Sequence, residues 1–456
     1  MKKNLIRALC VAGTIMVSTG VLAGCGQKND SDKSSGSQST KMETITVWSN
    51  NASQKAEDEK MVADFNNGPG KEKGITIDYK IYGGDYDNVL KVALSADEGP
   101  DMYKGSNFAF IKAGQAMPLE DLPGAKDWLK SYKDAGLLQN NVSVFNGKVY
   151  SVPYNSLTCA VAYNKDLLKK NGFNNPPKTW AELKQMAETV TKNGNGKEFG
   201  FIEGLKSTGY AGWNGLFQDI ASVGHSEWDA VAGKYDYSSF APFFQILVDM
   251  KKEGVWFPGV EGLNNDGARA QFAQGNIAFK LSASWDVGVW KDQFPAKMDW
   301  GWCRPVMDES NVNKYYIQNL PSFLIGKKAS KHPEKVFEVF KLWHSDEAAT
   351  AIYKNGKNIP LKDSIIKNTP APDIKNWKEI ADVSGGYNYP PTPAMDITVE
   401  GDTKEQAIIK ILLGTVPVKD GLADLDKRYN AAVDKAKSGG LDISGYMVKS
   451  MDNKVK

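Results

Sequence analysis

Hydrophobic and polar residues alternate with two different periods in the early part of the chain. Apolar residues predict a strand at residues 44–48, a helix at 54–65 and, through strict alternation, a second strand at 75–81. A helical stripe at 86–93 and a short strand beginning at Met102 follow. This β-α-β-α-β order predicts a parallel sheet covered by helices. Sheets of this kind bind ligands beyond the carboxyl ends of their strands.

The rest of the chain continues the mixed pattern. Further strands are predicted at 148–153, 159–163 and 277–281, and further helices at 266–274 and 332–353. A capping box starts another helix, because the Thr179 hydroxyl can accept from the Glu182 amide while Glu182 returns to the Thr179 amide. The length of 456 residues exceeds one ordinary domain, so we expect an α/β protein with two lobes.

The N-terminus carries an export signal. Three basic residues precede an apolar run at residues 9–21, which is too short and too interrupted for a stable membrane span but suits a signal peptide. The run ends in LAGC at residues 22–25, which resembles a bacterial lipobox. The resemblance implies a signal peptide at residues 1–24 and lipidation of Cys25; the alternative is a plain secretory signal with a chance cysteine. Residues 25–41 lack an apolar period and predict a flexible tether.

Composition and charge narrow the range of functions. Apolar residues make up 41% of the chain and charged residues 24%, as in soluble globular proteins. The formal net charge of +2 becomes −1 once the three basic residues of the signal are removed. The chain therefore lacks the excess of basic residues that is typical of nucleic-acid-binding proteins. Cys159 and Cys303 lie in apolar surroundings, where buried thiols are expected; a disulfide between them is the alternative.

Several sequence blocks resemble those of a known family. The central ones are NGKVYSVP at 146–153, AYNKDLL at 162–168 and PPKTWAEL at 176–183. Two further blocks agree: GPD and GQAMPL between residues 99 and 119, and FAQGNIAF, which leads into Trp285. Together these blocks resemble the extracellular solute-binding proteins of ABC importers. The similarity is closer to the carbohydrate-binding group that includes maltose-binding protein.

The resemblance implies a two-lobed α/β fold of the periplasmic-binding-protein type, with a hinge and a ligand cleft between discontinuous lobes. It places the N-terminal lobe at 42–155 and 312–365 and the C-terminal lobe at 156–311 and 366–456. It also implies a monomeric receptor that captures a carbohydrate and delivers it to the membrane permease subunits of the importer. With the lipid anchor, the expected location is the extracytoplasmic face of the cell membrane, in a Gram-positive-type bacterium.

Carbohydrate recognition needs flat aromatic surfaces beneath sugar rings and polar groups at their hydroxyl edges. Seven of the twelve tryptophans fall between residues 203 and 302, many beside polar residues or glycine, which favours an oligosaccharide over a monosaccharide. Trp213 and Trp285 lie in loops that resemble the family's stacking positions, and Tyr387 and Tyr389 fall where the family places another aromatic residue. For each of these side chains, packing in the core is the alternative.

The remaining candidate ligand contacts lie at or near predicted strand ends. They are Trp48, Asn50, Asn51, Asn107, Tyr154, Asn155, Glu203 and Asp286. For the asparagines and acids the alternative is a turn or helix-cap role, which is common for these residue types. The stretch at 154–157 departs from the maltose-binding pattern, which carries an acidic ligand contact there, so maltose itself is not expected.

Motifs of the common enzyme classes are absent from the sequence. His225, His332 and His344 are scattered, and there is no HExxH, no GxSxG and no cysteine pair at metal-ligand spacing. We therefore expect no enzyme activity, no cofactor and no metal site. Two rivals remain: a receptor of the same fold for a peptide or another polar solute, and an anchored glycosidase, whose paired carboxylates the 54 acidic residues could supply.

Overall fold

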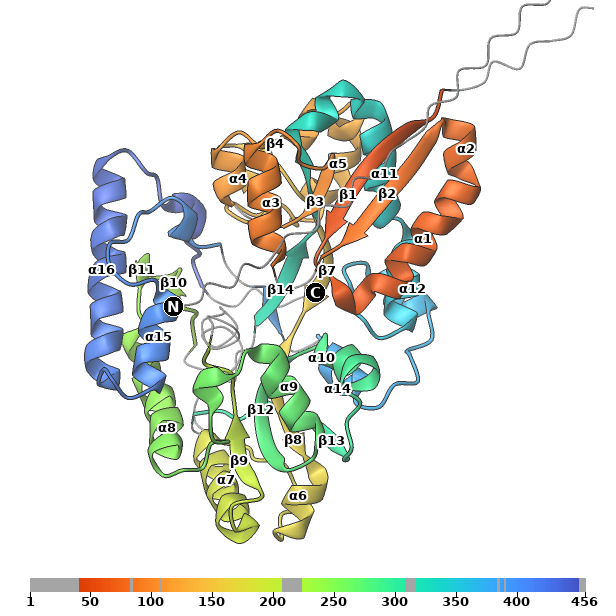
Figure 1. The fold of residues 1–456 in the computed structure, drawn as a ribbon. Coiled ribbons are helices and arrows are strands. Elements are labelled where there is room, and N and C mark those ends of the chain that lie inside the picture. The colour runs from red at the N-terminus through yellow and green to blue at the C-terminus, as the bar shows by residue number, and fades with distance from the viewer. Residues whose placement is uncertain are drawn as a thin grey trace, which may run out of the picture. The chain divides into compact units, whose positions relative to one another are not determined.

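The computed structural model describes residues 41–82, 85–105, 108–206, 224–307, 316–383, 386–388 and 391–450. Its helices and strands all belong to the compact unit Met42–Lys456. Two sheets carry helices on their faces, and a smaller sheet contains the strands that pass between them (Figure 1). The predicted α/β fold is confirmed. No helix among the described residues is both long and apolar enough to span a membrane.

The first sheet has the strand order β2-β1-β3-β15-β4. Its strands are β1 (Glu43–Ser49), β2 (Ile75–Ile81), β3 (Met102–Lys104), β4 (Ala116–Met117) and β15 (Phe323–Gly326). Strand β1 runs parallel to β2 and β3, as the hydrophobic pattern predicts. Strand β15 joins antiparallel to β3 and β4, so a segment from far along the sequence completes the sheet that begins the domain.

Helices cover both faces of this first sheet. They are α1 (Lys55–Asn67), α2 (Pro69–Lys73), α3 (Tyr86–Ser95), α4 (Phe108–Lys112), α5 (Ala125–Asp134), α11 (Pro333–Trp343) and α12 (Asp346–Lys354). Val47 of β1 clusters with Phe65 of α1 and Phe340 of α11. Tyr103 of β3 clusters instead with Leu90 of α3. Successive strand residues point to opposite faces, so the sheet separates two hydrophobic cores.

The second sheet has the order β13-β8-β12-β9. Its strands are β8 (Cys159–Asn164), β9 (Phe199–Ile202), β12 (Ile277–Ala283) and β13 (Trp300–Cys303). The surrounding helices are α6 (Lys165–Lys170), α7 (Trp180–Gly194), α8 (Ala241–Lys252), α9 (Asn265–Ala273), α15 (Lys404–Leu412) and α16 (Val418–Ser438). Strands β8 and β12 are buried along their whole lengths, as expected for strands covered on both faces.

The start of α7 tests the predicted capping box. Thr179 Oγ1 accepts a hydrogen bond from the Glu182 amide at 3.1 Å, as predicted. The Glu182 carboxylate accepts from the Lys178 amide at 2.6 Å, one residue before the predicted partner. Thr179 is extended and bridged to Val306, so the carboxylate meets the amide of the residue before the cap.

The third sheet, with the order β16-β7-β14-β17, connects the other two. Its strands are β7 (Pro153–Leu157), β14 (Tyr316–Pro321), β16 (Ile359–Pro360) and β17 (Tyr387–Asn388). Antiparallel strands β7 and β14 lead into β8 of the second sheet and β15 of the first sheet, respectively. Paired crossing strands of this kind can absorb the rotation of a hinge. The lobe boundaries given above stay a prediction.

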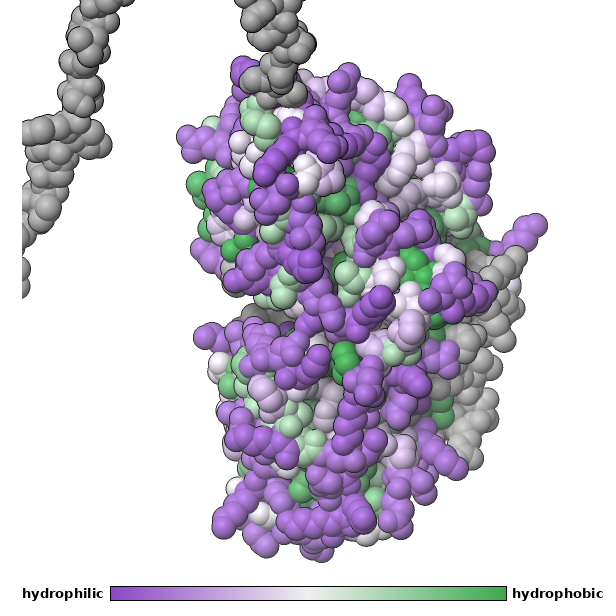
Figure 2. All heavy atoms as spheres, turned by 90° about the vertical axis from the view of Figure 1, so that its right-hand side faces the viewer, coloured by the Kyte–Doolittle hydropathy of each residue, from purple (hydrophilic) through white to green (hydrophobic). Residues whose placement is uncertain are grey.

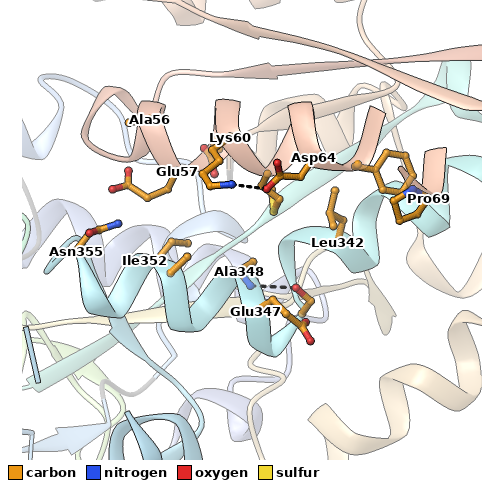
Figure 3. Close-up of a pocket in the computed structure, with 15 residues that line it drawn as sticks. Ala56, Glu57, Lys60, Asp64, Pro69, Leu342, Glu347, Ala348, Ile352 and Asn355 are labelled. Carbon is orange, nitrogen blue, oxygen red and sulfur yellow. Dashed lines mark hydrogen bonds and ion pairs between the residues drawn. The ribbon is translucent and has the colours of Figure 1, made fainter. Parts of the chain in front are cut away.

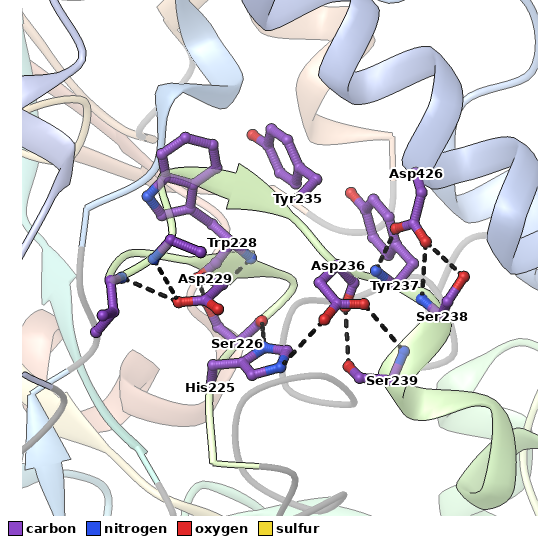
Figure 4. Close-up of polar contacts among 12 residues, drawn as sticks. His225, Ser226, Trp228, Asp229, Tyr235, Asp236, Tyr237, Ser238, Ser239 and Asp426 are labelled. Carbon is purple, nitrogen blue, oxygen red and sulfur yellow. Dashed lines mark hydrogen bonds and ion pairs between the residues drawn. The ribbon is translucent and has the colours of Figure 1, made fainter.

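A short hairpin attaches the C-terminal helix α16 to the second lobe (Figure 4). The hairpin consists of β10 (Trp228–Asp229) and β11 (Lys234–Tyr235). Asn430 of α16 bonds both the backbone amide and the backbone carbonyl of Tyr235, at 2.8 Å each, in the manner of a strand partner. Asp426, one turn earlier, accepts from the Tyr237 and Ser238 amides. These bonds fix the end of the chain to the body of the lobe.

The two cysteines of the described region are buried thiols. Cys159 and Cys303 lie on neighbouring strands β8 and β13, and no disulfide joins them. Burial raises the pKa of the Cys303 thiol, so it stays protonated. The preferred interpretation of the sequence is confirmed, and the alternative disulfide is wrong.

Candidate ligand-binding cleft

A cavity of about 540 Å³ opens where the two lobes and the crossing strands meet. The first lobe contributes Asn50, Asn51, Ala52, Ser53, Lys104 and Gly105; the second lobe Asp266, Arg269, Trp285, Val289 and Gln293; and the crossing region Tyr154, Leu320, Pro321 and Asn358. The first group lies at or just after the carboxyl ends of parallel strands β1 and β3, which is where such sheets place ligand sites. A ligand in this cavity would touch both lobes at once.

Polar side chains line the cavity on the side of the first lobe. Asn51 follows β1, and its Oδ1 accepts from the Ser53 hydroxyl at 2.7 Å while its amide Nδ2 lies 3.4 Å from the Tyr154 hydroxyl. Asn50 is exposed and lines the cavity beside it. Asn358 of the neighbouring crossing region is only 4% exposed and has a side-chain oxygen without a hydrogen-bond partner among the described residues. These amides can both donate to and accept from the hydroxyls of a polar ligand.

The second-lobe wall presents an aromatic side chain. Trp285 lies between β12 and the short helix α10 (Asp286–Gly288), and it is half-buried against the hydrophobic core of the lobe. Its remaining surface lines the cavity. A half-covered indole offers the flat apolar face on which a sugar ring can stack.

Arg269 on the same wall is held by two carboxylates. Its guanidinium lies 2.9 Å from an oxygen of Asp266 and 2.7 Å from an oxygen of Asp286. Asp286 is 1% exposed, and its other oxygen accepts from the Ser282 hydroxyl. Asp286 therefore acts on the cleft through Arg269, and we propose that it positions this side chain rather than touching ligand.

Glu203, another predicted ligand contact, is 1% exposed. Its carboxylate lies 3.2 Å from the ammonium of Lys280, which is itself fully buried and also bonds Asn265 Oδ1 and the Leu281 carbonyl. Burial raises the pKa of Glu203, and the Lys280 charge opposes that rise. We propose that this buried pair stabilises the second lobe instead of contacting ligand.

The other predicted contacts have different surroundings. Trp48 is half-buried, with its ring 4.8 Å from the Tyr82 ring, and Asn155 is 1% exposed within β7. Neither lines the described cavity. Asn107, Trp213, Tyr389 and the predicted lipidation site Cys25 lie outside the described residues, as does the side chain of Tyr387.

Sequence reasoning missed Lys104 at the end of β3. Its ammonium donates to the Pro321 carbonyl at 3.2 Å and lies 3.8 Å from the centre of the Tyr154 ring. Burial lowers the pKa of Lys104 to about 7, and the charge of Asp58 opposes that shift. The sequence could have indicated Lys104 by its position directly before Gly105, at the end of a predicted strand.

A second hollow, of about 630 Å³, lies between α1 and α12 (Figure 3). Figure 3 shows Lys60 and Asp64 paired along α1, with Leu342 and Ile352 nearby. All of its lining comes from the first lobe. Figure 2, which views this side of the molecule, shows mostly hydrophilic residues with hydrophobic ones in small separate areas. Because its lining comes from one lobe, this hollow differs from the cleft, which is lined by both lobes.

Comparison with known proteins fits this architecture. The family model described as "Bacterial extracellular solute-binding protein" matches residues 48–350. The chain belongs to this family. The chain is 25% identical over 277 residues to the melibiose/raffinose/stachyose-binding protein MelE of Bacillus subtilis, a match that covers 57% of this chain and 59% of MelE. It is 31% identical over 196 residues to the diacetylchitobiose-binding protein DasA of Streptomyces coelicolor, covering 42% and 43%.

Solved structures show the same two-lobed fold. A chitin oligosaccharide binding protein superposes with a TM-score of 0.65 at 19% identity, over 86% of this chain and 99% of that one. A sugar transporter protein from Bacillus licheniformis, in complex with stachyose, superposes with a TM-score of 0.61 at 21% identity, over 85% and 100%. The fold and the family predicted from the sequence are thus confirmed.

Proposed function

We propose that this protein is the substrate-binding component of an ABC-type sugar importer and captures an oligosaccharide in the cleft between its lobes. The observation that carries the proposal is the cavity of about 540 Å³ that is lined by both Trp285 and several asparagine side chains. A sugar ring has apolar C–H faces and a hydroxyl edge, and this cavity supplies a surface for each. The names of the relatives MelE and DasA describe carbohydrate binding, which supports the same ligand class.

The crossing strands support the proposed delivery of ligand to a permease. Because the cavity is lined by both lobes, a ligand contacts more protein when the lobes close, and it therefore favours the closed state. Closure on strands β7 and β14 would give the permease subunits a surface to recognise. We propose that the receptor works as a monomer, anchored through lipidated Cys25 on the outer face of the cell membrane.

A receptor accounts for the cleft better than a glycosidase. Hydrolysis of a glycosidic bond uses two carboxyl groups flanking the bond. Among the described residues that line the cavity, Asp266 is the only carboxylate, and it is bound to Arg269. Glu203 and Asp286 are buried in ion pairs. We propose that the protein binds its carbohydrate without cleaving it.

Thermal unfolding with a panel of solutes tests the proposal. The panel contains neutral oligosaccharides, acidic oligosaccharides and short peptides. A carbohydrate at one hundred times its Kd should stabilise the folded state by about 2.7 kcal/mol. Stabilisation by peptides alone would favour the peptide receptor, and release of new reducing ends from a bound oligosaccharide would favour the glycosidase.

A further inference from the structure

Among the residues that the structure describes, one cation of the cleft has no carboxylate partner. Lys104 is half-buried, lines the cavity and directs its ammonium at the Pro321 carbonyl and the Tyr154 ring. It forms no ion pair with any carboxylate that the structure describes. A single carbonyl bond leaves two of its three N–H donors for other acceptors.

The other cation of the cleft differs in this respect. Arg269 has its charge balanced by Asp266 and Asp286, each within ion-pair distance. The carboxylate that most affects Lys104 is Asp58, which instead accepts hydrogen bonds from Tyr79 at 2.7 Å and Trp343 at 3.1 Å. A partly buried cation without an adjacent counter-charge among the described residues is unfavourable, so an anionic group of a ligand would be stabilised beside it.

We propose that the ligand is a carbohydrate bearing an anionic group, and that this group pairs with the Lys104 ammonium when the ligand enters the cleft. The inference rests on the proposed function and names the ligand class within it. Lys104 then selects between acidic and neutral sugars, while Trp285 and the asparagines bind the rings and hydroxyls that the two kinds share. The anionic group is a carboxylate, as in a uronic acid, or a phosphate.

Pairing between Lys104 and a ligand anion should change the protonation of Lys104, which can be measured. Burial holds the pKa of Lys104 at about 7, so part of the population carries a neutral amine near neutral pH. A bound anion favours the charged form, so binding should take up a proton, and the affinity should fall as pH rises through and above 7.

Four other titratable groups near Lys104, which are Asp58, His344, Tyr154 and Tyr86, do not change their charge between pH 7.5 and 9. Burial raises the pKa of Asp58 to about 6 and lowers that of His344 to about 3. Burial also raises the pKa of Tyr154 on β7 and of Tyr86 on α3 far above neutrality. Between pH 7.5 and 9 Asp58 is ionised and the other three are neutral, so a proton taken up on binding comes to Lys104.

The test compares matched ligands on three proteins. Trigalacturonate and its methyl ester share one skeleton and differ in charge, and glucose 6-phosphate and glucose form the phosphate pair. Calorimetry measures each ligand against the wild type, Lys104→Arg, which keeps the charge, and Lys104→Met, which removes it. Denaturant unfolding of both variants, with affinity for the neutral ligand of the preferred pair, controls for folding.

The wild type should bind one anionic ligand at least about 10-fold more tightly than its neutral partner, with proton uptake at pH 7.5 in buffers of different ionisation enthalpy. Lys104→Met should bind the two equally, and Lys104→Arg should keep the preference without the proton uptake. Binding of neutral carbohydrates with no preference for either anionic form, and unchanged affinity in Lys104→Met, would overturn the inference and leave the proposed function intact. Failure of every carbohydrate to bind would overturn both.

Discussion

Two tryptophans five positions apart should respond in opposite ways to truncation. Trp285 is half-buried and lines the cleft, and Trp290 is 3% exposed. The Trp290 ring lies 4.8 Å from the rings of Phe272 and Trp300, and its indole N–H donates to the Arg269 carbonyl at 3.2 Å. Trp285→Ala should therefore weaken ligand binding, while Trp290→Ala should weaken the fold.

The size of each effect follows from buried area. A fully covered indole buries about 150–250 Å², and Trp285 already has part of its surface against the core. If a sugar covers about 80 Å² of the remainder, the gain at about 25 cal/mol per Å² is about 2 kcal/mol. Trp285→Ala should thus lower the affinity by about 10- to 100-fold. Trp290→Ala should instead lower the free energy of unfolding by about 3–5 kcal/mol.

Calorimetry and denaturant unfolding on the same two variants decide between these roles. The expected pattern is lost affinity with small destabilisation for Trp285→Ala, and large destabilisation for Trp290→Ala. Near-normal affinity in Trp285→Ala together with a large loss of stability would assign Trp285 to the core and refute the stacking argument.

Three further variants test two buried ionisable side chains and the anchor. Glu203→Gln should lower the free energy of unfolding by about 3–5 kcal/mol, because it leaves the Lys280 charge buried without its partner. Denaturant titration should show this with little change in ligand affinity, and a tenfold loss of affinity at unchanged stability would make Glu203 a ligand contact after all. Burial lowers the pKa of His344 from 6.5 to about 3, so its stabilising contribution is present above pH 6.5 and is lost as pH falls. Between pH 7 and 5 the wild type should lose about 2 kcal/mol of stability relative to His344→Phe, a comparison that cancels the opposite effect of Asp58; parallel stability curves would contradict the buried neutral imidazole. Cys25→Ala should release the protein from the membrane fraction or leave an uncleaved precursor, and normal processing with tight membrane association would refute lipidation.

Local sequence predicted those parts of the fold that local chemistry determines. The alternation at 75–81 predicted β2, and the Thr179 hydroxyl caps α7 as expected. The position of Trp285 after a strand predicted its place at the cleft, because strand ends meet at one edge of a sheet. Strand β15 was beyond such reasoning, since its antiparallel pairing with β3 depends on a segment distant in sequence.

The chemistry of the candidate site depends on partners that sequence does not bring together. The sequence makes Glu203 a candidate ligand contact. In the structure its carboxylate accepts from Lys280, 77 residues later. The same holds for Asp286 and Arg269. Lys104 shows the opposite case, because no carboxylate among the described residues forms an ion pair with its ammonium. Charge pairing is a property of the folded chain, so the sequence alone did not show the ion pairs of Glu203 and Asp286.

The identity of the ligand that co-purifies with the protein tests the central claim most directly. The domain beginning at Met42 would be purified without added solute, and native mass spectrometry would give the mass of any bound molecule, followed by fragmentation to identify it. The account predicts one oligosaccharide per chain in the wild type, lost or strongly reduced in Trp285→Ala and retained in Glu203→Gln. A bound peptide, or an oligosaccharide retained equally by Trp285→Ala, would contradict it.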